Sequence, residues 1–256
     1  MITLKSPREL ELMREAGNIV ALAHKAVEEN IRVGISTYEL DKIAYDVITK
    51  HGATPSFLNY NGYPASICAS INEVVVHGIP KKHTLLKDGD IVSVDIGACY
   101  KGYHGDCAKT YLVGHVSEEK KQLVEVTKMS LLAGLKFARP NNHLSDISHA
   151  IEEYAKQYGY GVVKDYTGHG VGHFLHEDPA IPNYGEAGHG VVLRKGMTLA
   201  IEPMITLGTD KVKVLKDGWT AVTKDGKASS HHEHSIVITD DGYEILTKIK
   251  GEEIDV

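Results

Sequence analysis

Four acidic residues of the sequence stand inside or beside strongly apolar runs. They are Asp95 in IVSVDIG, Asp106 in HGDCAKTYLV, Glu202 in LAIEPMI and Glu233 in EHSIVI. A buried carboxylate is costly unless it is paired, hydrogen-bonded or bound to metal. Each one alone is more often structural, but four together would repel one another and keep protons unless cations were present. With His169 as a nitrogen donor, the set predicts a site for divalent metal.

The segment TGHGVGHFLHEDPAIP, residues 167–182, holds His169, His173 and His176 among too many glycines and prolines for a helix. It is either a glycine-rich turn that happens to contain histidines or a backbone shaped to present imidazoles. Its G-x-G-x-G pattern is not followed by a helix, which argues against a dinucleotide site. We expect the glycines to let the backbone bend so that His169 and His176 reach the site, with His173 incidental.

The donor types narrow the choice of metal. Carboxylate oxygens and one imidazole, without cysteine sulfur, argue against a structural zinc site. Mn, Fe, Co or Zn in an open, carboxylate-bridged pair fits better, and the donors suffice for two divalent ions. Such a pair generates hydroxide at neutral pH and can hold the amine and carbonyl of a substrate for hydrolysis.

The helices and strands that must position these residues can be predicted from the spacing of apolar residues and from helix-capping residues, glycines and prolines. Two helices are expected over residues 6–31 and 36–52, then a strand over 66–77 and a hairpin over 86–114, with Gly102 and Gly105 in its connection. The same order follows again, with helices over 117–138 and 143–159, a strand over 193–208 and a closing hairpin over 231–247. The closing hairpin has an Asp241-Gly242 turn.

The second half repeats the first at a constant offset of 107 positions. On this offset Asp95 corresponds to Glu202, and the other matched pairs are Arg32 and Arg139, Leu40 and Ile147, Ala44 and Ile151, Gly52 and Gly159, and Gly89 and Gly196. We therefore expect one α+β domain over residues 1–256, built from related halves of roughly 1–115 and 116–256. Equivalent strands would lie side by side and bring Asp95 near Glu202.

The bulk composition bounds the class of protein. The chain has 256 residues, 42% hydrophobic and 24% charged, with a net charge of -6, as is typical of soluble globular proteins. No lysine or arginine run is present, which argues against direct binding of nucleic acid. Three cysteines without Cys-x-x-Cys spacing favour a reducing compartment. Without an apolar signal region or a long apolar span, we expect a cytoplasmic protein without a membrane partner.

The motifs taken together resemble a known family. HGIP at His77, DIGACYKGYHGD, TGHGVGHFLHEDP, IEP at Glu202 and EHS at Glu233 are similar to those of methionine aminopeptidases, in the short bacterial type I form without an N-terminal zinc-binding extension. The spacings from Asp95 to Asp106 and from His169 to His176 agree with that family. The resemblance implies its pseudo-two-fold "pita-bread" fold, with helices packed on a curved antiparallel sheet.

The resemblance also implies roles for the metal-binding residues. Asp95 would chelate the first ion, while Asp106 and Glu233 would bridge both. His169 and Glu202 would complete the second ion. The implied cofactors are two divalent ions, Co, Mn, Fe or Zn.

Three residues would act on the substrate. Glu202 would handle the proton of the bridging water, His77 would contact the scissile amide, and His176 would contact the carbonyl as charge develops there. Taken alone, His77 could simply hydrogen-bond the turn that follows it.

The resemblance places an apolar methionine pocket around six further residues, although their aromatic members could equally be core or loop residues. They are Phe57, Tyr60, Tyr63, Cys68, Leu175 and Trp219. Four residues depart from the usual family pattern: His231 and His232 before Glu233, Phe57 and Leu175. His173, His189, His231 and His232 are expected at the surface or behind the metal ligands.

The implied activity is removal of the initiator methionine from nascent proteins and peptides. Expected partners are N-terminal methionine peptides and nascent chains, with transient ribosome contact, and the protein is expected to be a monomer. Two alternatives remain open: another aminopeptidase of this fold, such as one with Xaa-Pro specificity, or a non-catalytic binding protein.

Overall fold

The structure, a computed structural model, describes residues 2–252; residue 1 and residues 253–256, the ends of the expected domain, lie outside the described residues. All four predicted helices are confirmed: α1 (Pro7–Glu28), α2 (Thr37–Lys50), α3 (Glu118–Leu135) and α4 (Leu144–Lys156). Ser6 and Ser36 start α1 and α2 with capping boxes, each accepting from the backbone N–H of the glutamate three residues on. None of the described helices is long and apolar enough to cross a membrane.

The first sheet contains the predicted hairpin. Strands β4 (Ile91–Tyr100) and β5 (Tyr103–Leu112) pair antiparallel, and β1 (Thr54–Pro55) and β2 (Ile67–Ile71) pair with β4. The connection is Lys101-Gly102, both with positive φ. Gly105 was expected in this connection, but it lies within β5 opposite Ala98. Its place there has a packing reason, because a Cβ on Gly105 would meet the backbone of α1 at 2.8 Å.

The second large sheet has the order β15-β14-β9-β7-β8. Its strands are β7 (Gly168–Gly170), β8 (Glu177–Ile181), β9 (Thr198–Ile201), β14 (His234–Ile238) and β15 (Tyr243–Ile245). Two small sheets complete the described strands, with β3 (Val74–Val76), β6 (Gly161–Val162), β10 (Met204–Thr206), β11 (Val212–Val214), β12 (Ala221–Thr223) and β13 (Ser229–His231).

Two predicted strands are each divided in the structure. The strand expected over 66–77 is broken into β2 and β3 at Asn72, which has a φ of 51°. The strand expected over 193–208 is broken into β9 and β10 at Glu202-Pro203, and the two pieces join different sheets. Proline cannot donate to a strand ladder, which explains the second break.

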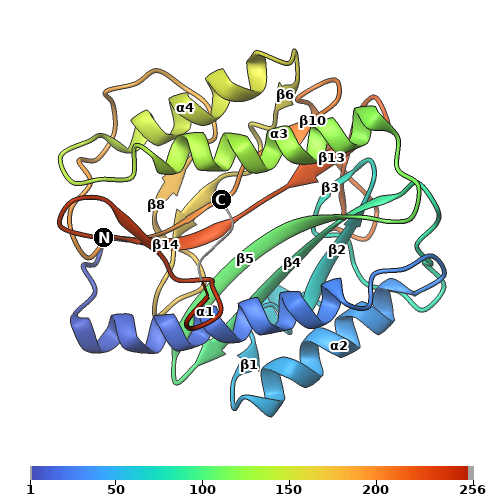
Figure 1. Ribbon diagram of the computed structural model, residues 1–256, viewed down its shortest axis with the longest axis horizontal. Helices are drawn as coiled ribbons and strands as arrows, with labels where there is room; N and C mark the ends of the chain where they lie inside the picture. The colour runs from blue at the N-terminus through green and yellow to red at the C-terminus, as the bar shows by residue number, and fades with distance from the viewer. Residues whose placement is uncertain (1, 253–256) are drawn as a thin grey trace.

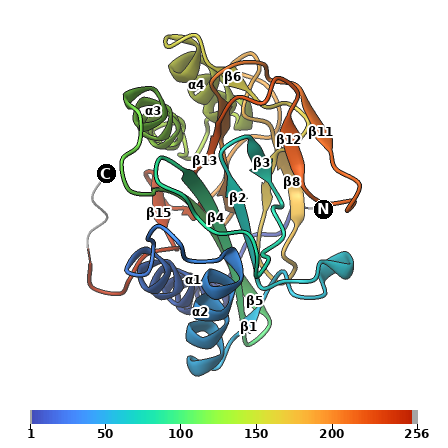
Figure 2. The ribbon, with the colours of Figure 1, turned by 90° about the vertical axis from the view of Figure 1, so that its right-hand side faces the viewer.

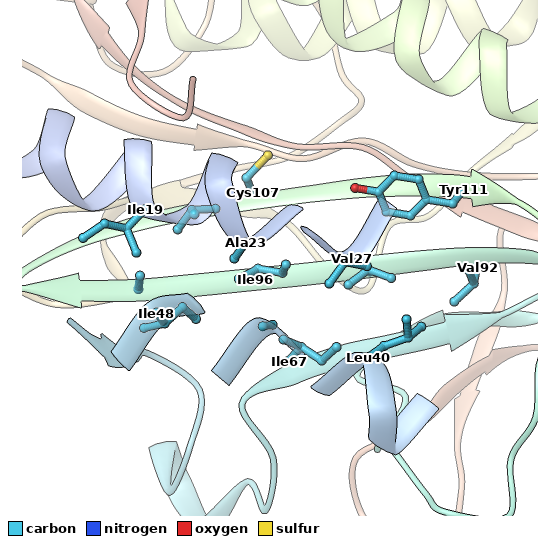
Figure 3. Close-up of a cluster of buried hydrophobic side chains, with 14 of the residues drawn as sticks. Ile19, Ala23, Val27, Leu40, Ile48, Ile67, Val92, Ile96, Cys107 and Tyr111 are labelled. Carbon is cyan, nitrogen blue, oxygen red and sulfur yellow. The ribbon is translucent and has the colours of Figure 1, made fainter. Parts of the chain in front are cut away.

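One helix pair packs against each large group of strands. Figure 1 shows α1 and α2 along one edge of the strands and α3 and α4 along the other, and in Figure 2 the β11–β12 hairpin lies on the side away from the helices. Ile19, Leu40, Ile67 and Ile96 meet in the core between the first helix pair and β4 (Figure 3). These side chains are fully buried, so the strands they hold are rigid supports.

The offset of 107 positions recurs in the element bounds. Helix α3 ends 107 positions after α1, α4 begins 107 positions after α2, and β9 begins 107 positions after β4. The offset also relates Asp95 in β4 to Glu202 at the end of β9.

Candidate metal centre

Asp95 and Asp106 face the same side of the first sheet. Asp95 of β4 pairs with Ala108 of β5, and Asp106 is two residues from Ala108, so the alternation of strand side chains points both carboxylates the same way. These two carboxylates, which stand within or beside apolar runs of the sequence, therefore lie close together on one face of the sheet.

The other three acid and imidazole donors come from the second half of the chain. His169 lies in the middle of β7, Glu202 directly follows β9, and Glu233 lies between β13 and β14. The backbone N–H of Glu233 donates to the carbonyl of Ala108 at 2.9 Å. This bond fixes the second half of the site against β5.

All five residues line one cavity of about 260 Å³. Nε2 of His169 is 3.5 Å from Oε1 of Glu202 and 3.7 Å from Oδ2 of Asp106. Donor atoms of Asp106, His169 and Glu233 all lie within 4.8 Å of one another. Nδ1 of His169 is 2.8 Å from the carbonyl of Gly170, so it donates there and leaves Nε2 free to bind metal.

The unpaired oxygens test whether these residues fit a cation. Oδ1 of Asp95, Oδ1 of Asp106 and Oε1 of Glu233 are buried with no hydrogen-bond partner among the described residues. Natural proteins rarely leave buried polar atoms in this condition. Divalent cations would satisfy all three oxygens, so the donor set fits a metal centre.

The electrostatics of the cluster point the same way. Burial raises the pKa of Asp106 to about 7. Burial and then the neighbouring carboxylates raise the pKa values of Asp95, Glu202 and Glu233 well above their ordinary range. Burial, followed by proximity to His176, lowers the pKa of His169 to about 3, which keeps its ring neutral and able to bind metal.

His77 and His176 line the same cavity. The ring of His176 lies 4.2 Å from that of His169, and its Nδ1 is 2.8 Å from the hydroxyl of Tyr60. Burial lowers the pKa of His77 to about 4 and also lowers that of His176, so both are neutral at pH 7. His77 has a φ of 59°, a costly conformation for a residue with a Cβ that is concentrated at functional sites.

An apolar pocket opens from the carboxylate cluster within this cavity. Tyr63 and Trp219 meet edge to face with ring centroids 5.1 Å apart. The six residues expected to line a methionine pocket form one cluster, namely Phe57, Tyr60, Tyr63, Cys68, Leu175 and Trp219. The structure thus brings together every residue that the sequence proposed for the site.

The glycines around His169 are also required by close packing. Neither Gly168 nor Gly170 has positive φ, but the strand is bulged between His169 and Gly170, and the chain bends over residues 172–176. A Cβ on Gly168 would lie 2.4 Å from the carbonyl oxygen of Ala200, and one on Gly170 would lie 2.1 Å from that of Asp178. Glycine is needed because the neighbouring strands approach too closely for a side chain.

For His231 the sequence left two positions open, at the surface or behind the metal ligands, and the structure shows the buried one. His173 and His189 are exposed, whereas His231 is only 2% exposed. Its Nε2 is 3.4 Å from Oε2 of Glu202. The available signal was spacing, because residues two apart in a strand point the same way and His231 is two residues before Glu233.

Comparisons with known proteins agree with the geometry. Residues 11–240 match the model of metallopeptidase family M24. The chain is 55% identical to methionine aminopeptidase 1 of Bacillus subtilis strain 168, covering 97% of this chain and 100% of that one. It is 42% identical to the methionine aminopeptidase of Escherichia coli K12, covering 99% and 96%.

Solved structures give the same result. The methionine aminopeptidase of Thermotoga maritima has a TM-score of 0.96 with 50% identity, covering 97% of this chain and 100% of that one. The prolidase of Pyrococcus furiosus has a TM-score of 0.77 with 26% identity, and this chain covers only 65% of it. The shared "pita-bread" fold is therefore confirmed. The chain belongs to metallopeptidase family M24 and, within it, to the bacterial methionine aminopeptidases.

Proposed function

We propose that this protein removes the initiator methionine from nascent proteins and peptides by metal-dependent hydrolysis. The observation that carries the proposal is the shared cavity, in which the carboxylate cluster and the apolar pocket lie side by side. A methionine side chain in the pocket would place the peptide bond that follows it beside the cluster.

The proposed metal ligands keep the roles that the family resemblance implies. Asp95 would help to hold the first ion, His169 and Glu202 would help to hold the second, and Asp106 and Glu233 would be shared by both. When bound, the two ions supply a hydroxide nucleophile at neutral pH and Lewis acidity for the substrate carbonyl.

Three residues of the chain then move protons and hold the substrate. Glu202 accepts the proton of the attacking water and passes it toward the leaving amine. His176, oriented by Tyr60, donates a hydrogen bond to the carbonyl oxygen as negative charge develops. His77 contacts the scissile amide, and its neutral ring suits hydrogen bonding without adding charge.

The pocket selects methionine by shape and by the softness of its sulfur. Aromatic rings favour contact with a thioether, and Tyr63 and Trp219 present such rings. The departures at Phe57 and Leu175 lie in this pocket and set its width.

We further propose a cytoplasmic monomer, a single domain of two related halves, and transient contact with the ribosome. Two exposed lysines of the β11–β12 hairpin, Lys213 and Lys216, support the last point, while the neighbouring Lys211 pairs with Asp210. Charge on a projecting hairpin suits brief association with a large anionic assembly.

A peptide panel tests the proposed function. With Mn or Co added, the protein should cleave Met-Gly-Met-Met and leave an Xaa-Pro peptide intact, and a chelator should abolish cleavage. Turnover of only the Xaa-Pro peptide would instead support the alternative specificity. This chain covers only 65% of the prolidase of Pyrococcus furiosus, which does not favour Xaa-Pro specificity. Turnover of neither peptide would leave a binding protein.

A further inference from the structure

His231 lies beside two of the proposed metal ligands, Glu202 and Glu233. It is the last residue of β13 and pairs with Met204 of β10. Its Nε2 is 3.4 Å from Oε2 of Glu202 and 3.9 Å from Oε2 of Glu233. The imidazole is therefore directed at the same carboxylates that the proposed function assigns to metal.

The nitrogen of His231 that faces these carboxylates is unsatisfied. Nε2 is buried and has no hydrogen-bond partner among the described residues. A buried polar atom left unpaired destabilises the folded state, so the position favours a partner for this nitrogen. One of the two carboxylates beside it, that of Glu233, also has an unpaired oxygen, Oε1.

The distances fit shared metal ligation better than a direct hydrogen bond. An N–H···O bond has its donor and acceptor about 2.9 Å apart, shorter than the 3.4 Å found at His231. Two ligand atoms held at about 2.1 Å from one ion in tetrahedral geometry lie about 3.4 Å apart. His169 shows the same separation, with its Nε2 3.5 Å from the other oxygen of Glu202.

We propose that His231 is a sixth metal-binding side chain, acting in one group with Glu202 and Glu233. Donor atoms of these three residues lie within 4.8 Å of one another, as do those of Asp106, His169 and Glu233. The inference rests on the proposed metal roles of Glu202 and Glu233.

A second imidazole changes which ions the centre prefers. Carboxylate oxygens suit Mg and Mn, whereas imidazole nitrogen favours Co, Fe and Zn. His231 should therefore raise affinity for Co more than affinity for Mn.

Proton NMR of the Co-loaded protein tests the ligand count directly. Each histidine bound to Co(II) gives one strongly shifted, solvent-exchangeable imidazole N–H signal. We expect two such signals in the wild type and one in His231→Gln. His173→Gln is the matched control, because His173 is an exposed histidine whose Nδ1 contacts the carbonyl of Gly102, and it should keep both signals. A single signal in the wild type would overturn the proposal even if His231→Gln failed to fold.

Calorimetric titration of the metal-free proteins supplies a second readout. His231→Gln should weaken Co binding by about 10-fold or more and Mn binding much less. Equal weakening of both metals would contradict ligation and leave His231 a residue that only orients Glu202. Peptide cleavage is measured separately, so a wild type with two N–H signals and no turnover would refute the proposed function while sustaining the ligand assignment.

Discussion

Glu202 has an imidazole nitrogen beside each of its carboxylate oxygens, from His169 on one side and His231 on the other. Its backbone carbonyl also accepts a hydrogen bond from the Asn183 side chain at 3.0 Å. The residue therefore has polar neighbours on three sides at the break between β9 and β10. These surroundings suit the proposed role of a group that binds an ion and moves a proton.

Replacing this carboxylate by its amide should remove the proton acceptor and keep the shape. We expect Glu202→Gln to fold normally and to lower kcat on Met-Gly-Met-Met by about 10²–10⁴-fold. Steady-state kinetics at saturating metal, with circular dichroism to check folding, make the measurement. A kcat close to wild type would remove Glu202 from proton transfer.

His176 should affect the transition state and not the metal. His176→Ala is expected to lower kcat by about 10²–10³-fold while the metal content of the purified protein stays normal. Loss of metal together with activity would show that the assigned role is wrong. His173→Ala, a change in an exposed histidine of the same segment, is expected to keep full activity.

The sequence alone was enough to pick out most of the candidate metal ligands. A carboxylate among apolar residues, as at Asp95 and Asp106, can be recognised without knowing the fold. The depth of His231 was not visible, because burial depends on which strands come together around it.

The segment that carries Leu175 and His176 is fastened by the N-terminal residues. Nζ of Lys5 is 2.6 Å from Oε2 of Glu177, and both side chains are largely buried. Oε1 of Glu177 accepts from the backbone N–H of Phe174 at 3.1 Å. Lys5, which is far in sequence from the proposed metal ligands, thus helps to hold the segment around His176 in place.

Breaking this ion pair should loosen the segment. Lys5→Met leaves Glu177 without its cation, and we expect a stability loss of about 3 kcal/mol. We also expect a higher KM and a lower kcat on methionine peptides, because both the pocket and the carbonyl donor move. Urea unfolding and steady-state kinetics are the measurements.

The matched control is an ion pair of the same length at the surface. Nζ of Lys195 is 2.6 Å from Oδ2 of Asp240, with both side chains exposed. Lys195→Met should change stability by less than about 0.5 kcal/mol. Equal effects of the two changes would mean that the pair at Lys5 has no special hold on the segment.

Elements were predictable where local signals are strong. Ser6 and Ser36 mark helix starts by their own hydrogen bonds, so the helices were placed to within a few residues. The break at Asn72 was missed because apolar residues stand on both sides of it, and there the chain passes from one sheet to another. The break at Glu202 was missed although Pro203 follows it directly.

The proposed metal ligands come from strands of both halves of the molecule and lie around one cavity. Ser235 of β14 exchanges hydrogen bonds with the backbone of Asp106 in β5, at 2.8 and 3.1 Å. The two large sheets are therefore joined beside the proposed metal centre. The stability of the protein should depend on whether the carboxylates of this centre are protonated, charged or bound to metal.

The contribution of Asp106 to the stability of the metal-free protein should fall as pH rises. Burial raises the pKa of Asp106 from an ordinary 3.8 to about 7, so between these values the folded state holds a proton on this side chain that the unfolded chain releases. The contribution of Asp106 to the free energy of unfolding is thus larger near pH 4 and falls toward pH 7, whereas the buried neutral histidines act in the opposite sense. Added Mn or Co should raise the melting temperature more at about pH 7.5 than at about pH 5, as calorimetry can check. An equal rise at both would contradict a proton-holding cluster.

Glu233, the proposed bridging carboxylate, follows Asp95 by 138 positions in the sequence. Synthesis on the ribosome must therefore deliver both halves of the proposed site before a working centre can form. We expect copies terminated before Glu233 to be inert, and an emerging copy to trim no neighbour until that residue has left the ribosome.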